Sequence, residues 1–189
     1  PTFMDEKAMC NTLTAAKDVD GISLASLAAV FTDAPDGFPP CTAAACVAIL
    51  EHYKVPIVGK HVVVIGRSLV VGKPVSMMLL RRNASVTICH SRTENLQEIS
   101  RSADIVICAT GRARAYGREY FRPGQTVLDV GINFDVHGKL CGDVDFDEVE
   151  PIVDAITPVP GGVGTVTTSM TMQHTVAAAE AQLKESLKG

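Results

Sequence analysis

The sequence predicts an α/β fold built on a doubly wound parallel sheet. From Lys60 onward, short runs of β-branched and aliphatic residues alternate with helical patterns across short connections, which is typical of repeated strand-helix-strand units. The first run, residues 62–65, is continuously apolar rather than alternating, as expected of a strand buried on both faces. Glycines follow several of the runs and indicate where those strands end.

The expected elements of this sheet follow in order along the chain. We expect strands at residues 62–65, 85–89, 104–109 and 126–130, and helices at residues 75–80 and 96–100. Pro123-Gly124 is a turn signal before the fourth strand. Because crossovers between parallel strands are right-handed, these segments should form one sheet with helices on both faces.

The two ends of the chain show helical patterns without strands. We expect helices at residues 5–13, 24–31, 43–53 and 169–187, with Thr42 as the N-cap of the third. Their apolar faces have no obvious sheet to cover, so we expect them to pack on a second, largely absent domain or on a partner subunit. The predicted division is residues 1–55 for the remnant of that second domain, 56–165 for the sheet domain, and 166–189 for a helix that packs back on the second domain.

Composition argues against nucleic-acid and membrane partners. The net charge is −4, and no Lys/Arg run is longer than Arg81-Arg82, so the basic surface that nucleic acid needs is not predicted. No apolar stretch approaches the roughly 18 residues that span a bilayer, and the first residues do not resemble a signal peptide. A cytoplasmic protein is therefore expected.

Cysteine and histidine spacing gives no support for a metal site. The six cysteines contain no Cys-x-x-Cys pair, and Cys46, Cys89 and Cys108 lie in strongly apolar patterns. We interpret them as reduced core thiols rather than disulfide or metal ligands. The five histidines lack the spacing of zinc ligands.

A glycine-containing turn, residues 66–72, follows the first strand. Such a turn lets backbone N–H groups approach a pyrophosphate at the positive end of a helix. It differs from the G-x-G-x-x-G pattern, since Ser68 replaces the second glycine and one extra residue precedes Gly72. By itself it fits an ordinary strand-to-helix turn equally well. An ATP-binding phosphate loop is disfavoured because the glycines are one residue too far apart and Pro74 replaces the magnesium-binding hydroxyl.

The end of the second strand favours NADP over NAD. An NAD site usually places an acidic residue about 20 residues beyond the glycine turn, where it binds the ribose hydroxyls. This chain has Cys89-His90-Ser91-Arg92 there, with no carboxylate before Glu94. A carboxylate would repel a 2′-phosphate, whereas Arg67, Ser91 and Arg92 are suited to bind one through charge-assisted hydrogen bonds. His90 either assists or is simply a packed histidine.

Loops after the later strands complete the predicted binding edge of the sheet. Residues 109–111 and 131–133 place small side chains beside the expected nicotinamide half of the cofactor, although glycines there also fit plain turns. Residues 156–164 contain two prolines and three glycines, which predicts a rigid loop that closely admits a flat ligand. The alternative is a generic rigid linker. Residues 165–167 then lead into the final helix.

Taken together, these segments resemble the bifunctional methylenetetrahydrofolate dehydrogenase/cyclohydrolase family, known as FolD. The matching pieces occur in the family's order along essentially the whole chain. They are Lys17-Asp18-Val19-Asp20-Gly21, Pro40-Cys41-Thr42, Gly66-Arg67-Ser68, Val71-Gly72-Lys73-Pro74, Val86-Thr87, Cys89-His90-Ser91, Asp129-Val130-Gly131-Ile132-Asn133, Gly142-Asp143-Val144-Asp145-Phe146 and Thr157-Pro158-Val159-Pro160-Gly161-Gly162-Val163-Gly164.

The resemblance implies a Rossmann-like NADP-binding domain, an N-terminal catalytic domain, and a homodimer that binds tetrahydrofolate derivatives in the cleft between domains. It implies oxidation of 5,10-methylenetetrahydrofolate by NADP and hydrolysis of the methenyl product to 10-formyltetrahydrofolate, a step of one-carbon metabolism and purine biosynthesis.

The resemblance also implies roles for individual residues. Asp20 is the implied catalytic residue and binds the pterin. The implied NADP-binding residues are Gly66, Arg67, Ser68, His90 and Ser91, with Arg67 and Ser91 at the 2′-phosphate, and Thr110, Ile132 and Thr167 on the nicotinamide side. The implied folate-binding residues are Pro160, Gly161, Gly162 and Val163.

Some features depart from the family pattern. The Tyr-x-x-x-Lys motif, whose lysine assists both reactions, does not occur in the chain, and the Gln-Leu-Pro-Leu-Pro stretch is also missing. Smaller departures are Ala113 and Thr165-Val166, where many members have Pro and Pro-Met. We therefore expect this chain to be the C-terminal portion of such an enzyme and to be inactive by itself. The alternatives are a stand-alone NADP-binding module without catalysis and an amino-acid or shikimate-type dehydrogenase.

Overall fold

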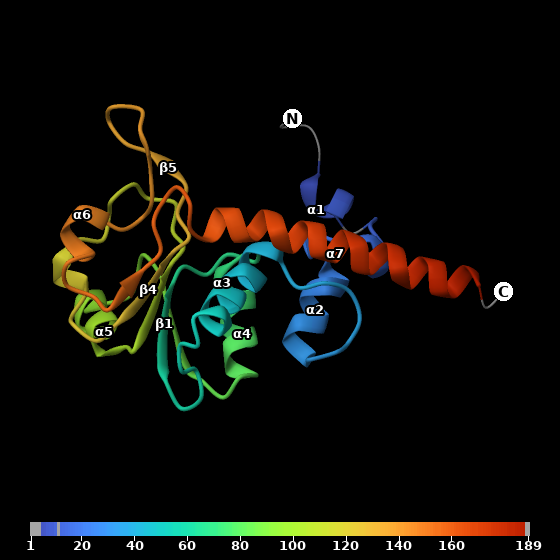
Figure 1. Ribbon diagram of the computed structural model, residues 1–189, viewed down its shortest axis with the longest axis horizontal. Coiled ribbons are helices and arrows are strands. Elements are labelled where there is room, and N and C mark those ends of the chain that lie inside the picture. The colour runs from blue at the N-terminus through green and yellow to red at the C-terminus, as the bar shows by residue number, and fades with distance from the viewer. Residues whose placement is uncertain (1–4, 11, 188–189) are drawn as a thin grey trace.

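A five-stranded parallel sheet forms the centre of the computed structural model, which describes residues 5–10 and 12–187 (Figure 1). The strands lie in the order β2-β1-β3-β4-β7. Their bounds are His61–Ile65 (β1), Ser85–Cys89 (β2), Ile105–Cys108 (β3), Thr126–Asp129 (β4) and Ala155–Ile156 (β7). The predicted doubly wound α/β fold is confirmed.

The interior strand β1 is a continuous apolar run because both faces of the sheet are covered there. Val62 and Val64 of β1 belong to one buried cluster, whereas Val63 and Ile65 belong to the cluster on the opposite face. Side chains of a strand alternate between faces, so both sets must be apolar when helices lie on both sides. Cys46, Cys89 and Cys108 are buried in these clusters as predicted.

The first face of the sheet is covered by α3 (Cys41–His52), α4 (Gly72–Leu80) and the start of α7 (Val163–Ser186). The sequence predicts no sheet contact for the helix near residues 43–53, whereas in the structure this helix packs on the sheet. Small side chains such as Ala43 and Ala45 bring α3 close to the strands, and Leu50 is fully buried there. Part of the apolar surface near the N-terminus therefore has a sheet to cover.

The second face carries shorter elements. These are α5 (Leu96–Ser102), the 3-10 helix η2 (Arg118–Tyr120) and α6 (Phe146–Val149). Phe121, Val144 and Val149 pack with them against the strands. The sequence did not predict η2 or α6, because elements of three or four residues are too short to show a period.

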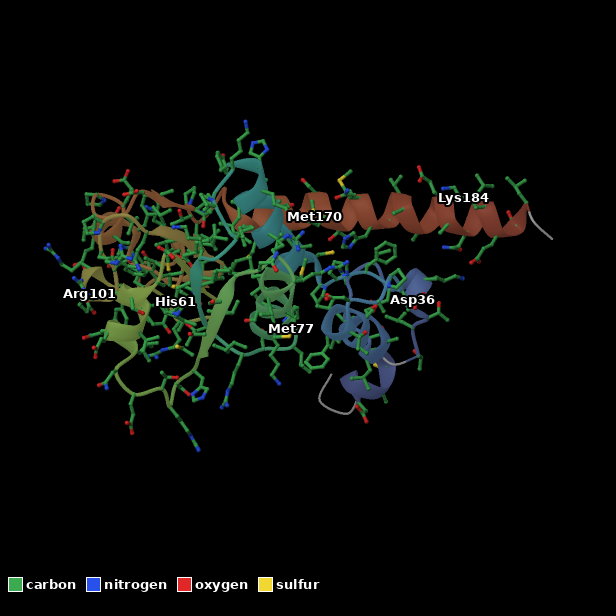
Figure 2. All side chains as sticks on the ribbon, turned by 90° about the horizontal axis from the view of Figure 1, so that it is seen from below. Asp36, His61, Met77, Arg101, Met170 and Lys184 are labelled. Carbon is green, nitrogen blue, oxygen red and sulfur yellow. The ribbon has the colours of Figure 1, made fainter. Side chains whose placement is uncertain are left out.

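The N-terminal elements lie at one end of the molecule along α7. They are α1 (Glu6–Cys10), the 3-10 helix η1 (Ala15–Lys17) and α2 (Leu24–Thr32). Helix α7 starts beside the sheet and runs past them (Figure 1). Figure 2 shows Met170 near the sheet end of α7 and Lys184 at its far end. The helix predicted at residues 5–13 ends at Cys10 in the described part of the chain, and residue 11 lies outside the described residues.

Several predicted boundaries were wrong. Helix α3 begins at Cys41 with Pro40 at its N-cap, so Thr42 is already inside the helix. Helix α7 begins at Val163, so residues 165–167 are helical rather than a lead-in. Gly and Thr are poor helix formers, and this hid the first two turns of α7 from the sequence. The two-residue strand β7 and the hairpin of β5 (Asn133–Phe134) and β6 (Leu140–Cys141) were also not predicted.

Truncating Leu50 should destabilise the sheet domain. Leu50 is fully buried on α3, so Leu50→Ala should lower the free energy of unfolding by about 2–5 kcal/mol. Leu80→Ala is the matched control, because Leu80 is 54% exposed. Denaturant unfolding of both variants measures the difference, and equal small losses would show that α3 does not contribute to the core.

Candidate functional site

A pocket of about 410 Å³ opens where the carboxyl ends of β1, β2 and β3 meet. The chain passes from β1 to β2 on one side and to β3 on the other, and ligands of open α/β sheets bind at such a reversal of strand order. The volume lies within the usual range for small-molecule sites. Its walls come from all three strand ends: Gly66, Arg67, Ser68, His90, Ser91, Thr93, Leu96, Ala109, Thr110, Arg112, Ala115, Tyr116 and Tyr120.

The turn after β1 is tightly packed, which explains two of its glycines. Gly66 has φ +136°, and a Cβ there would lie 2.3 Å from the carbonyl oxygen of Ala109. A Cβ on Gly72 would lie 2.2 Å from the carbonyl oxygen of Gly66. Neither position has room for a side chain, so the turn is held against the end of β3.

Ser68 has a structural task in this turn as well. Its hydroxyl accepts hydrogen bonds from the backbone N–H groups of Val71 at 3.1 Å and Gly72 at 3.4 Å. These N–H groups belong to the start of α4, which the hydroxyl caps. A serine in place of the second glycine therefore stabilises the start of α4 at the edge of the pocket.

The structure brings together most of the predicted nucleotide-binding residues. Gly66, Arg67, Ser68, His90, Ser91 and Thr110 all line the one pocket. The His90 ring accepts the N–H of Arg92 through Nδ1 at 3.2 Å, and the His90 N–H donates to the Thr93 hydroxyl at 2.9 Å. An accepting Nδ1 leaves the ring proton on Nε2. The turn after β2 thus fixes the ring beside Ser91.

Charged side chains of this pocket are arginines. Arg67 and Arg112 line it, and none of its lining residues is Asp or Glu. Sequence reasoning did not assign Arg112, Tyr116 and Tyr120. The two tyrosine rings meet edge to face at 5.1 Å, and burial raises the pKa of Tyr116, whose hydroxyl donates to Thr110 at 3.3 Å. No sequence motif marks these residues, which lie in the irregular segment after β3 and in the short helix η2.

Two buried carboxylates fix the loops that surround the pocket. Asp143 is fully buried and accepts hydrogen bonds from the backbone N–H groups of Thr110, Gly111 and Arg112. It also accepts from the Thr110 hydroxyl at 3.0 Å and the Asn133 side-chain amide at 2.9 Å. Asp143 therefore holds the loop after β3 against the segment after β4.

Asp129 forms the second half of this frame. Its carboxylate accepts from the N–H groups of Gly131 at 3.0 Å and of Asp143 and Val144 at 2.9 Å. A side chain on Gly142 would overlap this carboxylate, and one on Gly131 would overlap that of Asp143. Because neither glycine has a side chain, the Asp129 carboxylate can lie against the backbone at Gly142, and the Asp143 carboxylate against the backbone at Gly131. Both acids stand in segments with the family's pattern, but nothing in the sequence indicated this pairing.

A second pocket, of about 160 Å³, lies beside Asp129 and the segment that follows β4. Ile132, Pro160, Gly161 and Gly162 line it, together with Gly131 and residues at the start of α7. The Val163 side chain does not lie there, since it is 2% exposed and packs in the core. Its predicted contact with folate stays a prediction and would have to be made by its backbone. Thr167 lies one turn further along α7, and its hydroxyl donates to the Val163 carbonyl at 3.0 Å.

Asp20 stands apart from both pockets. It is exposed in the turn between η1 and α2, and neither pocket includes it in its lining. In residues 5–10 and 12–187, no group of three His, Cys, Asp or Glu side chains is arranged to hold a metal ion. No helix within the same residues is long and apolar enough to cross a membrane.

A family model for the NAD(P)-binding domain of tetrahydrofolate dehydrogenase/cyclohydrolase matches residues 40–183. The chain belongs to this family. The match includes every strand and the whole first pocket, so the family assignment and the pocket's position agree. The resemblance seen in the sequence is confirmed, and the alternative of an amino-acid or shikimate-type dehydrogenase is excluded.

Individual relatives agree with the family model. The chain is 56% identical over 182 residues to the bifunctional protein FolD of Carboxydothermus hydrogenoformans, covering 95% of this chain and 63% of that protein. The bifunctional FolD enzyme of Campylobacter jejuni superposes with a TM-score of 0.93 at 37% identity, over 96% of this chain and 64% of that one.

A FolD structure from Trypanosoma brucei is complexed with NADP cofactor and an inhibitor. It superposes with a TM-score of 0.90 at 35% identity, over 97% of this chain and 65% of that one. The chain thus spans somewhat less than two thirds of the length of these relatives.

The buried Asp129 predicts a distinctive dependence of stability on pH. Burial raises the pKa of Asp129 from 3.8 to about 6, against the effect of its three N–H donors. Between these two values the folded state holds a proton that the unfolded state has lost, so the free energy of unfolding falls as pH rises. The shift corresponds to a loss of about 3 kcal/mol, complete above pH 6.

Asp129→Asn removes this titration, so the measurement is the difference in unfolding free energy between wild type and variant from pH 4 to pH 7. We expect wild type to lose stability relative to Asp129→Asn across this range. Asp147→Asn, at a side chain 80% exposed, is the control and should change little. A difference that rises with pH would mean that the N–H donors outweigh burial.

Proposed function

We propose that this chain binds NADP in the pocket at the ends of β1, β2 and β3. The observation that carries this assignment is that the pocket's charged lining side chains are Arg67 and Arg112, without a carboxylate. An acid at the ribose would repel a 2′-phosphate, whereas a guanidinium binds it through charge-assisted hydrogen bonds. The NADP complex of the Trypanosoma brucei relative supports the same cofactor.

The residues around the pocket fit the parts of such a cofactor. Arg67 and Ser91 would hold the 2′-phosphate, with Ser68 and His90 beside them, and Gly66 lets the backbone approach the pyrophosphate at the start of α4. Thr110, Ile132 and Thr167 would lie along the nicotinamide side. When bound, NADP supplies an acceptor for hydride, and the protein's task is to orient it.

Removing the Arg67 side chain should weaken the binding of NADPH more than the binding of NADH. Arg67→Ala should weaken binding of NADPH by roughly 1.5–3 kcal/mol, as for a hydrogen bond to a charged group, and leave NADH nearly unaffected. Titration calorimetry of both cofactors at one fixed salt concentration measures this. Arg81→Ala is the control, because Arg81 lies outside the pocket and pairs with Asp33 at 3.6 Å. Equal losses for both cofactors would show that Arg67 acts through fold stability.

We further propose that the chain is the nucleotide-binding part of an enzyme with two reactions. The first oxidises 5,10-methylenetetrahydrofolate with NADP, and the second hydrolyses 5,10-methenyltetrahydrofolate to 10-formyltetrahydrofolate. Family membership supports both. Asp20 would bind the pterin, and Pro160, Gly161, Gly162 and the backbone at Val163 would line the folate cleft. Holding the folate methylene carbon against the nicotinamide makes hydride transfer effectively unimolecular.

The proposed activity also requires the part of the relatives' sequence that this chain does not span. The family's Tyr-x-x-x-Lys motif is not found in residues 1–189, so the 189 residues alone should lack cyclohydrolase activity. Exposed apolar side chains on α7, such as Met172 and Leu183, support an N-terminal catalytic domain that packs against this helix. The sequence places the divisions at residues 55 and 165, but α3 and the start of α7 pack on the sheet, so we propose that the elements before α3 and the later part of α7 contact this second domain.

A homodimer in the cytoplasm that serves one-carbon metabolism and purine biosynthesis completes the proposal. Phe134 and Val136 on the β5–β6 hairpin are 70% and 95% exposed. The hairpin projects from the body of the molecule (Figure 1). We base the proposed dimer on family membership and on this neighbouring pair of exposed apolar side chains.

Asp20→Asn in the full-length gene product tests the folate side. The neutral amide cannot accept hydrogen bonds at both of its atoms, so we expect kcat/KM for 5,10-methylenetetrahydrofolate to fall about tenfold or more, the value of one hydrogen bond to a charged group. Asp36→Asn is the control, because Asp36 is an exposed loop carboxylate outside both pockets. Wild type that binds NADPH without folate turnover would instead support a stand-alone NADP-binding module.

A further inference from the structure

The turn that carries Asp20 is fixed first by its neighbour Asp18. The Asp18 carboxylate is 1% exposed and accepts the N–H groups of Ile22 at 3.1 Å and Ser23 at 2.8 Å. Burial opposes the charge, but hydrogen bonds from Ser23, Ser26 and the backbone hold the pKa of Asp18 below its ordinary value. Asp18 thus ties the turn to the start of α2 and is not available to a ligand.

A second attachment holds the carbonyl of Val19, directly before Asp20. His174 Nδ1 lies 2.9 Å from the Val19 oxygen, and the Cys41 thiol donates to the same oxygen at 3.2 Å. His174 and Cys41 are 8% and 5% exposed. The imidazole also stacks on Phe38 with ring centroids 4.9 Å apart. Since an imidazole nitrogen that faces a carbonyl must carry the proton, Nδ1 is the donor.

Asp20 itself is restricted through its backbone and open through its side chain. The N–H of Cys41 donates to the Asp20 carbonyl at 3.4 Å. A Cβ on Gly21 would lie 2.5 Å from Phe38, Pro39 and Pro40, so this residue cannot shift toward the start of α3. Burial raises the pKa of the Cys41 thiol, and the nearby Asp20 carboxylate raises it further. The exposed carboxylate therefore stands beside an uncharged thiol on a rigid turn.

Helix α7 connects this turn to the second pocket. The helix starts at Val163, next to the pocket of Gly161 and Gly162, and carries His174 eleven residues later, about 16 Å along the axis at 1.5 Å per residue. Its first half packs on α3. The half of α7 between the pocket and His174 is one continuous helical segment, so it sets the distance between the pocket and the Val19 carbonyl.

We propose that His174 is a positioning residue for Asp20: its Nδ1–H holds the Val19 carbonyl so that the Asp20 carboxylate faces the folate that spans from Asp20 to the second pocket. This inference rests on the proposed role of Asp20 in folate binding. His174 does not touch the folate. Its effect should appear in the binding of folate and not in the binding of NADP.

Two substitutions separate this role from packing alone. His174→Leu retains an apolar side chain in the buried site but removes the donor. His174→Asn places an amide nitrogen on Cγ, where Nδ1 is attached in histidine, so it restores a donor to Val19 without the ring. A structural role would follow side-chain volume and the Phe38 stack, whereas a positioning role follows the donor.

Steady-state kinetics of the full-length gene product measures the effect. For His174→Leu we expect KM for 5,10-methylenetetrahydrofolate to rise about tenfold, the value of one hydrogen bond of about 1.4 kcal/mol. KM for NADP should stay unchanged, and His174→Asn should restore the folate KM. KM does not depend on the fraction of folded enzyme, and His174→Phe, which keeps a ring against Phe38, serves as a second donor-free variant.

A double-mutant cycle with Asp20→Asn completes the test. If His174 acts through Asp20, His174→Leu should not raise the folate KM further in the Asp20→Asn background. Three outcomes would overturn this inference but not the proposed function. The first is an unchanged folate KM in His174→Leu, and the second is a failure of His174→Asn to restore that KM. The third is a full effect of His174→Leu in the Asp20→Asn background. Wild type without folate turnover, or Asp20→Asn with normal kinetics, overturns the proposed function and this inference with it.

Discussion

Two buried carboxylates, Asp129 and Asp143, hold together the binding edge of this molecule. A carboxylate removed from water is costly unless hydrogen bonds replace the lost hydration. Here the replacements are mostly backbone N–H groups, three to Asp129 and three to Asp143, from loops that follow different strands. Each loop is therefore fixed by the same charges, and the two pockets take their shape from loops that cannot move independently.

This arrangement also sets the charge of the nucleotide pocket. Asp129 and Asp143 are turned inward and hydrogen-bonded to backbone N–H groups, whereas Arg67 and Arg112 line the pocket. A chain with a net charge of −4 thus presents a cationic pocket to its ligand. Local placement, not overall charge, decides which cofactor fits. The same logic operates beside the middle of α7, where buried Asp18 fixes the turn and leaves Asp20 exposed.

Sequence reasoning succeeded where the signal is local. The strands predicted at residues 62–65 and 85–89 agree closely with β1 and β2. For β1 the signal is a continuous apolar run, as required of a strand buried on both faces. The turn at Gly66 and the cluster of Arg67, His90 and Ser91 follow from the rule that loops at one edge of a parallel sheet converge. It failed for β7 and the β5–β6 hairpin, whose two-residue strands are too short to show a period, and for the first turns of α7, where Gly and Thr are poor helix formers.

The sequence by itself determined the α/β fold and the family, since both depend on residue types at short spacing, and it predicted a nucleotide site at the loop after β1. Only the tertiary structure decided that α3 covers the sheet, that Val163 lies in the core, and that Asp143 closes the loop after β3. It also joined His174 to Val19, a pair 155 residues apart. Contacts between distant segments depend on how helices pack against the sheet, and no local pattern encodes that geometry.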